Sequence, residues 1–274
     1  MDERPDMSPT PEQTRRWLAA IAVRRSRRSF DGLPVAEADL DALESLCRSF
    51  RPYGDARVAL VRQAPATIFK GLVGSYGKVT GALSALIFLG TPAEDGTDQH
   101  LGFTGEALVL EATALGLDTC WIGGALDRRV AAGVAHIMPG ERVFAISPLG
   151  HATSDAPSSE RLIFGWGKPK KRRAIDEIAP DSADWPVWAA AGLEAARVAP
   201  SAMNRQPWRF RQGSDGIIVS GSGVNTPGLT HALDCGIAML HFELAARAVG
   251  YPGAWVDAEA DSRDVARWLP EASS

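Results

Sequence analysis

Apolar residues recur along this chain at two spacings, one typical of helices and one typical of strands. A helix that packs on a core repeats its apolar residues every three or four positions, whereas a buried strand shows a short continuous or alternating apolar run. The helical spacing predicts helices over residues 14–23, 36–48, 101–115, 127–135, 184–198 and 231–249. The short runs predict strands over residues 57–62, 82–89, 142–147, 217–220 and 254–256. This mixture predicts an α+β protein.

Segments rich in glycine, proline and polar residues separate these elements. They predict loops over residues 71–81, 154–171 and 201–208. Residues 1–13 are polar and hold three prolines, so we expect a flexible N-terminal tail there. The folded domain is then expected to span residues 14–274.

The second half of the chain repeats part of the first. A shift of 134 residues lays residues 101–121 over residues 235–255. The six identical positions are Gly102/Gly236, Leu110/Leu244, Ala112/Ala246, Ala114/Ala248, Gly116/Gly250 and Trp121/Trp255. Two alanine-rich helices can match by chance, but the shared terminal glycine and the tryptophan that follows it favour a duplication. The sequence therefore predicts a single domain of two pseudo-equivalent halves, over about 14–178 and 179–274.

The composition narrows the class of protein. Of 274 residues, 45% are hydrophobic and 23% are charged, the balance of an ordinary globular protein. The longest apolar stretch, over residues 82–89, is too short to span a bilayer, and the first residues lack the apolar segment of a secretory signal. We therefore expect a cytoplasmic protein without membrane contact. The net charge of −4 argues against nucleic acid as a partner, and three scattered cysteines argue against a disulfide framework or a zinc site.

Two basic segments are candidates for binding an anion. Residues 24–28 read Arg-Arg-Ser-Arg-Arg, so four guanidinium groups and a hydroxyl lie within five residues. Such groups can surround a phosphate with charge-assisted hydrogen bonds. On spacing alone, a solvated basic face or a helix C-terminus is the favoured interpretation. The second run, Lys168–Arg173, is either a solvated loop or another arm of the same phosphate site.

Two further segments combine unusual loops with polar groups. Residues 199–210 place a serine, an asparagine and a glutamine between two prolines, and amides suit the edge of a flat heterocycle. Equally, these amides could satisfy the backbone of a helix-to-strand connection. In Thr119–Gly124, paired glycines allow backbone N–H groups to approach a ligand, although a simple turn is favoured. Cys120 within this turn is expected to be a buried core residue rather than a nucleophile.

Several common catalytic motifs are missing from the sequence. There is no phosphate-binding G-x-x-x-x-G-K-[ST], no G-x-S-x-G and no H-E-x-x-H, and His231 and His241 do not share a helix face. This pattern is expected where a cofactor carries the reaction.

Taken together, these segments resemble the flavin-dependent nitroreductase superfamily. The resemblance rests on residues 24–30, 105–124, 170–172 and 199–210, and the stretch over 74–78 is most similar to the branch labelled "putative TM nitroreductase". It covers most of residues 15–256. It implies a nitroreductase-like three-layer α/β/α sandwich and FMN as the cofactor. Members of the family usually form homodimers with two FMN sites at the interface.

This chain departs from the family pattern in the order of its motifs. The first half carries the Arg-Arg-Ser element, but it has only the degenerate segment Arg51–Gly54 where its own APSxxNxQPW element should stand. The second half carries APSAMNRQPW but no Arg-Arg-Ser element after it. The resemblance therefore implies a single chain that mimics the homodimer and binds one FMN. Whether fused chains pair further is left open.

The resemblance also implies a role for each motif residue. The phosphate would be held by Arg24, Arg25, Ser26, Arg28, Lys170 and Arg172. The pyrimidine and ribityl side would be contacted by Ser75 and Lys78, and the ring near N5 by Trp121, Gly123 and Gly124. The opposite half would contribute Pro200, Ser201, Asn204 and Gln206. No catalytic side chain and no metal are expected, because flavin N5 carries the chemistry.

The implied reaction takes hydride from NADH or NADPH and reduces a small acceptor such as a nitroaromatic or a quinone. A flavin-binding or flavin-sequestering protein with little turnover is the alternative, favoured by the loss of one half-site pair. Binding of an anionic partner such as nucleic acid through the basic runs is the least favoured, given the net negative charge.

Overall fold

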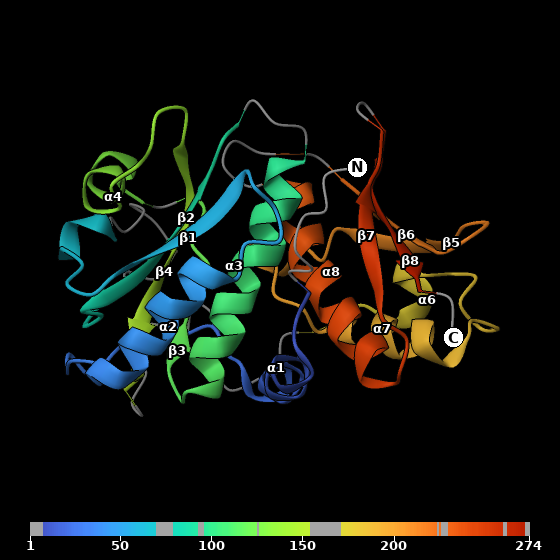
Figure 1. Ribbon diagram of the computed structural model, residues 1–274, viewed down its shortest axis with the longest axis horizontal. Helices are drawn as coiled ribbons and strands as arrows, with labels where there is room; N and C mark the ends of the chain where they lie inside the picture. Colours follow the sequence, from blue (N-terminus) through green and yellow to red (C-terminus); the bar gives the residue numbers. More distant parts are fainter. Residues whose placement is uncertain are drawn as a thin grey trace.

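The computed structural model describes residues 8–69, 79–92, 96–124, 126–153, 171–223, 225, 230–259 and 262–271 (Figure 1). The helices are α1 (Pro11–Val23), α2 (Glu37–Ser49), η1 (Ala66–Ile68), α3 (Thr97–Ala114), α4 (Arg128–Val134), α6 (Ile175–Ile178), α7 (Val187–Arg197), η2 (Ala202–Asn204) and α8 (His231–Ala248). The strands are β1 (Ala56–Val61), β2 (Ser84–Gly90), β3 (Asp118–Thr119), β4 (Arg142–Gly150), β5 (Trp208–Gln212), β6 (Ile217–Gly221), β7 (Gly253–Asp257) and β8 (Asp264–Pro270).

The strands form two antiparallel sheets with the same topology. The first sheet has the order β1-β2-β4-β3, and the second has the order β5-β6-β8-β7. In each sheet the strands therefore lie in the order first, second, fourth and third along the chain. The long helices α3 and α8 pack against each other between the two sheets (Figure 1).

The two sheets differ in how they are covered. Helices α2 and α3 pack on one face of the first sheet, while α4 and η1 cover the other, so β2 is buried at every position. This half has three layers, and the expected α+β class is confirmed. In β5 and β6, buried residues alternate with accessible ones, because α7 and α8 cover one face of that sheet. Alternation of this kind is typical of a sheet with one face towards water.

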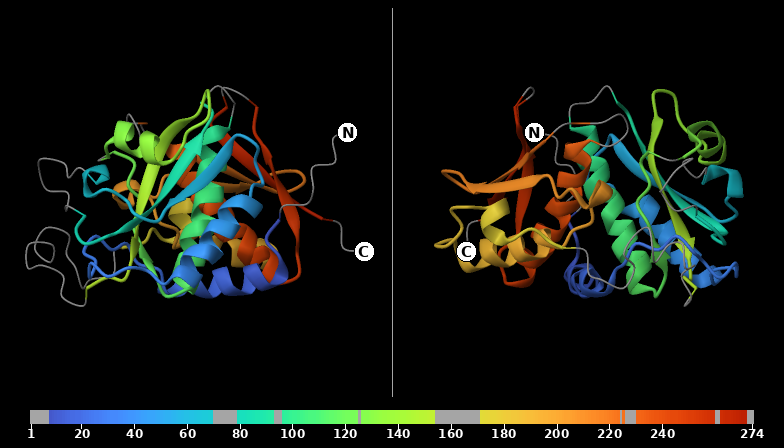
Figure 2. Two further views of the ribbon diagram at one scale, coloured as in Figure 1. Left: turned by 60° about the vertical axis from the view of Figure 1, so that its left-hand side comes forward. Right: turned by 180° about the vertical axis from the view of Figure 1, so that it is seen from behind.

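Helix α1 lies across both central helices (Figures 1 and 2). It begins with a capping box, in which the side chain of Thr10 accepts from the N–H of Gln13 and the N–H of Thr10 donates to the Gln13 side chain. The expected tail over residues 1–13 is therefore wrong for residues 8–13, because Ser8 accepts from Arg247, Thr10 caps α1 and Pro11 suits the first turn of a helix. The rest of that prediction, for residues 1–7, lies outside the described residues.

Glycines allow the central helices to cross closely. A Cβ atom on Gly102 of α3 would collide with the carbonyl oxygen of Leu233 in α8, and one on Gly236 would collide with the carbonyl of Gln99 in α3. The two contacts are reciprocal. Gly102 and Gly236 are 134 positions apart, and so are their contact residues Gln99 and Leu233. The helices also begin and end at positions that differ by 134. Within the described residues, no helix combines the length and the apolar character needed to cross a membrane.

Candidate cofactor site

The arginine-rich segment leaves α1 in an extended conformation and joins the edge of the first half. The backbone of Ser26 pairs with that of Thr119, and the N–H of Thr80 donates to the carbonyl of Arg28 at 2.9 Å. The segment therefore runs between residues 79–82 on one side and residues 118–122 on the other. This places the predicted phosphate-binding residues next to the predicted glycine turn.

Trp121, which precedes that turn, is held firmly. Its ring stacks on Phe88 with 4.0 Å between the ring centroids, and its Nε1 donates to Glu106 Oε2 at 2.7 Å. Gly105 leaves room for the indole, since a Cβ there would press on the ring. Beyond the tryptophan, Gly124 is exposed, and no atom lies within 4 Å of where its Cβ would stand. A rigid aromatic side chain is therefore followed by open backbone.

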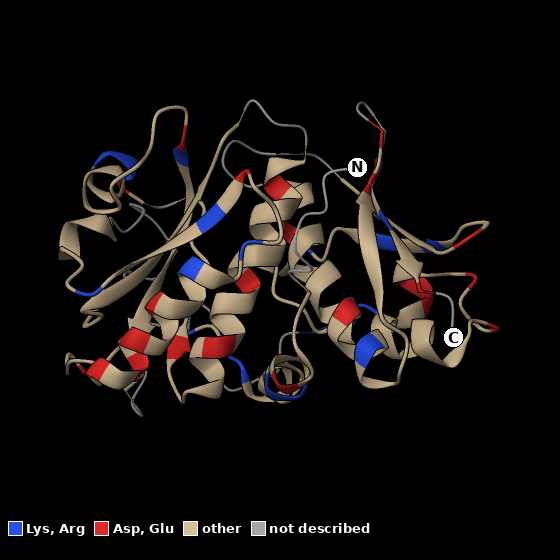
Figure 3. Cartoon of the chain, viewed as in Figure 1, with Lys and Arg blue, Asp and Glu red and all other residues tan. Residues whose placement is uncertain are grey.

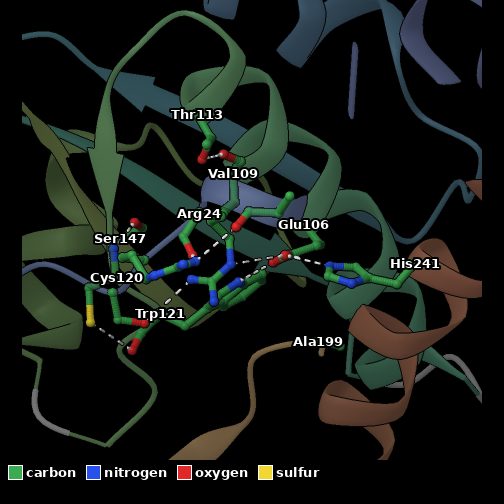
Figure 4. A network of polar contacts seen from close by, with 12 residues as sticks. Arg24, Glu106, Val109, Thr113, Cys120, Trp121, Ser147, Ala199 and His241 are labelled. Carbon is green, nitrogen blue, oxygen red and sulfur yellow. Dashed lines mark hydrogen bonds and ion pairs between the residues drawn. The ribbon is translucent and has the colours of Figure 1, made fainter. Parts of the chain in front are cut away.

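Glu106 is the centre of a buried polar network that links the two halves (Figure 4). Its Oε1 lies 3.9 Å from Arg24 Nε and 3.0 Å from His241 Nε2, and the other imidazole nitrogen lies 3.1 Å from the carbonyl oxygen of Ala195. Because a carbonyl only accepts, His241 Nδ1 donates to Ala195, while Nε2 faces the carboxyl group of Glu106. This network therefore fixes Arg24 and Trp121 together.

Glu106 and His241 were not predicted as part of this site. A carboxyl group within the apolar run of the 101–115 helix was an available signal, because a buried carboxylate requires partners. The partner could not have been found in the same way, since His241 lies on another helix 135 residues away.

The loop before β5 has an unusual backbone. Met203, Asn204 and Gln206 all have positive φ angles, of 51°, 58° and 48°. Asparagine tolerates this conformation, but for the other two it costs about 1 kcal/mol or more each. Helix α8 compensates through Asp234, which accepts from the N–H of Ala202 at 3.0 Å and from the Arg205 side chain at 2.9 Å. Asp234 thereby fixes the shape of this loop.

The amide side chains of this loop hold the basic segment that precedes α6. Gln206 Oε1 accepts from the N–H of Arg173 at 2.8 Å, and its Nε2 donates to the carbonyl of Lys171 at 3.2 Å. Asn204 also donates to that carbonyl, at 3.1 Å. The Ser201 hydroxyl accepts from the N–H of Gln206 at 3.0 Å. In this structure the two amides thus bind backbone, the alternative raised by the sequence, and their contacts with a cofactor stay predictions.

Guanidinium groups from the segment after α1, the segment before α6 and the end of α7 converge at this point. Arg172 donates to the carbonyl of Ala199 at 2.7 Å. Burial, followed by repulsion from Arg24, Arg197 and Arg25, lowers the pKa of Arg172 to about 10. The pKa of Arg24 is also lowered by burial, against the attraction of Glu106. A bound anion would relieve this repulsion, so the donor set fits a phosphate group.

The structure thus brings together the predicted residues of both halves, within the part of the chain that it describes. Residues 24–28 lie beside Trp121 and the glycine turn, and Arg172 joins them to the loop with Pro200 and Ser201. Arg197 at the end of α7 also faces this group and was not predicted from the sequence. The predictions for Ser75, Lys78 and Lys170 lie outside the described residues. Cys120 is buried, as expected.

A known family has the same sequence pattern. The family described as "Putative TM nitroreductase" matches residues 17–246. The chain belongs to this nitroreductase family. The crystal structure of a "putative nitroreductase" from Thermotoga maritima MSB8 is similar over 98% of both chains, with 20% identity and a TM-score of 0.61. At this identity the similarity shows the nitroreductase fold.

A nitroreductase with bound FMN from Bacteroides fragilis NCTC 9343 matches 58% of this chain and 95% of its own, with 19% identity and a TM-score of 0.44. A comparison with curated proteins found no match.

Proposed function

We propose that this member of the nitroreductase family is an FMN-dependent oxidoreductase. It takes hydride from NADH or NADPH and reduces a small acceptor such as a nitroaromatic or a quinone. The observation that carries this proposal is the convergence of Arg24 and Arg25 with Arg172, which is bonded to the loop of the second half, beside Trp121. When bound, FMN supplies the hydride-transfer chemistry at its N5 atom.

The side chains divide the work of binding by their chemistry. The arginines, with Ser26, would hold the phosphate, since guanidinium groups form charge-assisted hydrogen bonds with phosphate oxygens. Trp121 and the backbone of Gly123 and Gly124 would line the ring. The proposed FMN-binding set is completed by Arg28, Ser75, Lys78, Lys170, Pro200, Ser201, Asn204 and Gln206.

The protein contributes orientation to the reaction. Stacking on Phe88 and the hydrogen bond to Glu106 hold Trp121 in one position, so a ring bound beside it would be presented to both substrates in one pose. No acid or base side chain is needed for hydride transfer. Because both halves contribute to the site, one chain suffices as the functional unit.

The absorbance spectrum of the purified protein tests the proposal directly. We expect a flavin spectrum, or one acquired after incubation with FMN, that bleaches on addition of NADH or NADPH and returns with an acceptor. A colourless protein that stays free of FMN after incubation would refute it.

A flavin-binding protein with little turnover is the second candidate. It is supported by the presence of only one complete pair of half-sites in the sequence. Steady-state assays separate the two functions. FMN that binds tightly, without oxidation of NADH or NADPH by any acceptor, would favour the second candidate.

A further inference from the structure

The 134-residue shift relates hydrogen bonds as well as sequence. At the end of α3, the N–H of Leu117 donates to the carbonyl of Ala112 at 2.9 Å. At the end of α8, the N–H of Tyr251 donates to the carbonyl of Ala246 at 3.0 Å. The two donors are 134 positions apart, and so are the two acceptors. The same shift relates the glycine contacts at the helix crossing. Contacts of this reciprocal kind are those of a two-fold symmetric pair. The central helices and the segments that follow them therefore have counterparts in the two halves.

In each half, a side chain of the central helix bonds to the loop that precedes the first strand of the sheet. The two side chains stand at positions related by the 134-residue shift. In α8 this position is Asp234, which binds the loop of the candidate site. Its counterpart in α3 is His100, whose Nδ1 lies 2.9 Å from Asp55 Oδ1, directly after the degenerate segment Arg51–Gly54. The Tyr53 ring of that segment stacks on the imidazole, with 3.9 Å between the centroids. The degenerate segment thus occupies the place that corresponds to the loop of the candidate site.

The glycine turn also has a counterpart, and it has changed character. Gly123 corresponds to Asp257, the last residue of β7. Asp257 Oδ2 lies 2.9 Å from His100 Nε2, and its Oδ1 accepts from the Gln99 side chain at 3.3 Å. Where the candidate site has open backbone, the corresponding place has a carboxylate that is bonded across to the other half.

Charges at this place oppose an anionic ligand. Burial disfavours the charged imidazole of His100, but the hydrogen bonds and charges of Asp257 and Asp55 outweigh it and raise its pKa to about 9. Tyr53 on the loop and Glu243 on α8 also face this place, and burial together with the charges of Glu243, Asp257 and Asp55 raises the tyrosine pKa. Asp55 and Asp257 thus both lie on His100, and Glu243 is paired with Arg247 at 2.7 Å. Each of these cations already has an acidic partner, which disfavours a phosphate or a negatively charged reduced flavin.

We propose that the place related to the candidate flavin site by the internal symmetry is closed by a clamp of Asp55, His100 and Asp257. This clamp joins the two halves directly and leaves one cofactor site in each chain. The count of one site rests on the proposed function, whereas the clamp itself does not.

Thermal unfolding of the FMN-free protein as a function of pH tests the clamp. Because the pKa of His100 is raised on folding, its contribution is fully present below about pH 6.5 and is lost as the pH rises through about 9. We expect His100→Gln to lower the melting temperature by about 5 °C at pH 6 and by much less at pH 9.5. The matched control His151→Gln changes an exposed imidazole and should leave the wild-type pH profile intact.

A second variant covers the case in which His100→Gln does not fold. Asp257→Asn keeps the shape of the side chain but removes the charge that reaches across the halves, and it should show a smaller loss with the same pH dependence. A pH profile unchanged from wild type in the folded variant would overturn the clamp.

Equilibrium titration with FMN tests the number of sites. We expect one FMN per chain in the wild type, and the same number and affinity in Asp257→Asn, because the clamp lies outside the candidate site. Two FMN molecules per wild-type chain would overturn the inference. If no FMN binds at all, the proposed function fails, and the pH profile still decides whether the clamp exists.

Discussion

The surroundings of Glu106 and those of His100 are two buried polar places with opposite charge balance. Around Glu106, one carboxylate faces Arg24 and His241, and Arg25 and Arg172 lie near Arg24. Around His100, one imidazole faces two carboxylates, each at 2.9 Å. The first place gathers more positive charge than its carboxylate can balance, whereas the second is satisfied by its own side chains. The difference teaches that a site for an anion can be recognised by charge that the protein leaves unbalanced.

The largest expected effect concerns the helix crossing that both places share. Gly102→Ala and Gly236→Ala should each lower the free energy of unfolding by about 3 kcal/mol or more, since each new Cβ meets a backbone carbonyl. Equal losses would support the internal symmetry. Chemical denaturation measures them. Gly133→Ala is the matched control in α4, where nothing lies within 4 Å, and it should be neutral or stabilising. Two very different losses would break the symmetric description.

The next largest effect on stability is expected at Glu106, the carboxylate that faces Arg24. Glu106→Gln keeps an acceptor for Trp121 but leaves the buried Arg24 without its carboxylate partner. We expect a loss of about 3 kcal/mol in the free energy of unfolding, together with altered tryptophan fluorescence. The exposed change Glu12→Gln is the control. An unchanged stability would mean that charge balance at this place does not matter to the fold.

A smaller effect on the fold, but a clear one on binding, is expected at Arg172. Arg172→Ala removes a repelled cation, so the melting temperature of the FMN-free protein should change little. The Kd for FMN should rise about 10-fold or more, because a charge-assisted contact with the phosphate is lost. Titration of FMN measures this. Arg48→Ala, an exposed arginine on α2, should leave the Kd unchanged. Equal affinities of the two variants would contradict the assignment of the phosphate site.

The smallest effect on stability is expected for the exposed ion pairs between Arg62 and α2. Figure 3 shows acidic residues along α2, and Arg62 binds Glu37, Asp41 and Glu44 there at 2.6 Å. Exposed ion pairs contribute little because water screens them. Arg62→Ala should shift the melting temperature by about 2 °C or less at physiological salt. A shift as large as that of Glu106→Gln would show that burial does not explain the contrast between the two places.

Local patterns were sufficient to predict most of the fold. Helices α2, α3, α4, α7 and α8 were expected within a few residues of their bounds, because each has apolar residues at helical spacing and a clear end. β5 and β8 were not predicted as strands. Their apolar residues are interrupted by arginines that point to the open face of the second sheet, so neither segment reads as an apolar run.

The candidate site was predictable only where its chemistry lies in short motifs. The arginine run and the loop over 199–208 could be recognised because their residues are close in sequence. Glu106 with His241 and His100 with Asp257 could not, since these partners are 135 and 157 residues apart and meet only through the helix crossing. Their pairing depends on tertiary structure, which periodicity does not encode.

Gly123 and Asp257 occupy corresponding positions in the two halves but are different residues. This difference bears on how such a protein can evolve. In a homodimer, one codon specifies the same residue in both subunits, so a carboxylate that closes one binding place closes the other as well. If the two halves of this chain arose by duplication, each position has its own codon and is free of that restriction. One position can then keep a glycine beside the ligand. The other can change to an aspartate that bonds to the opposite half, as Asp257 does with His100.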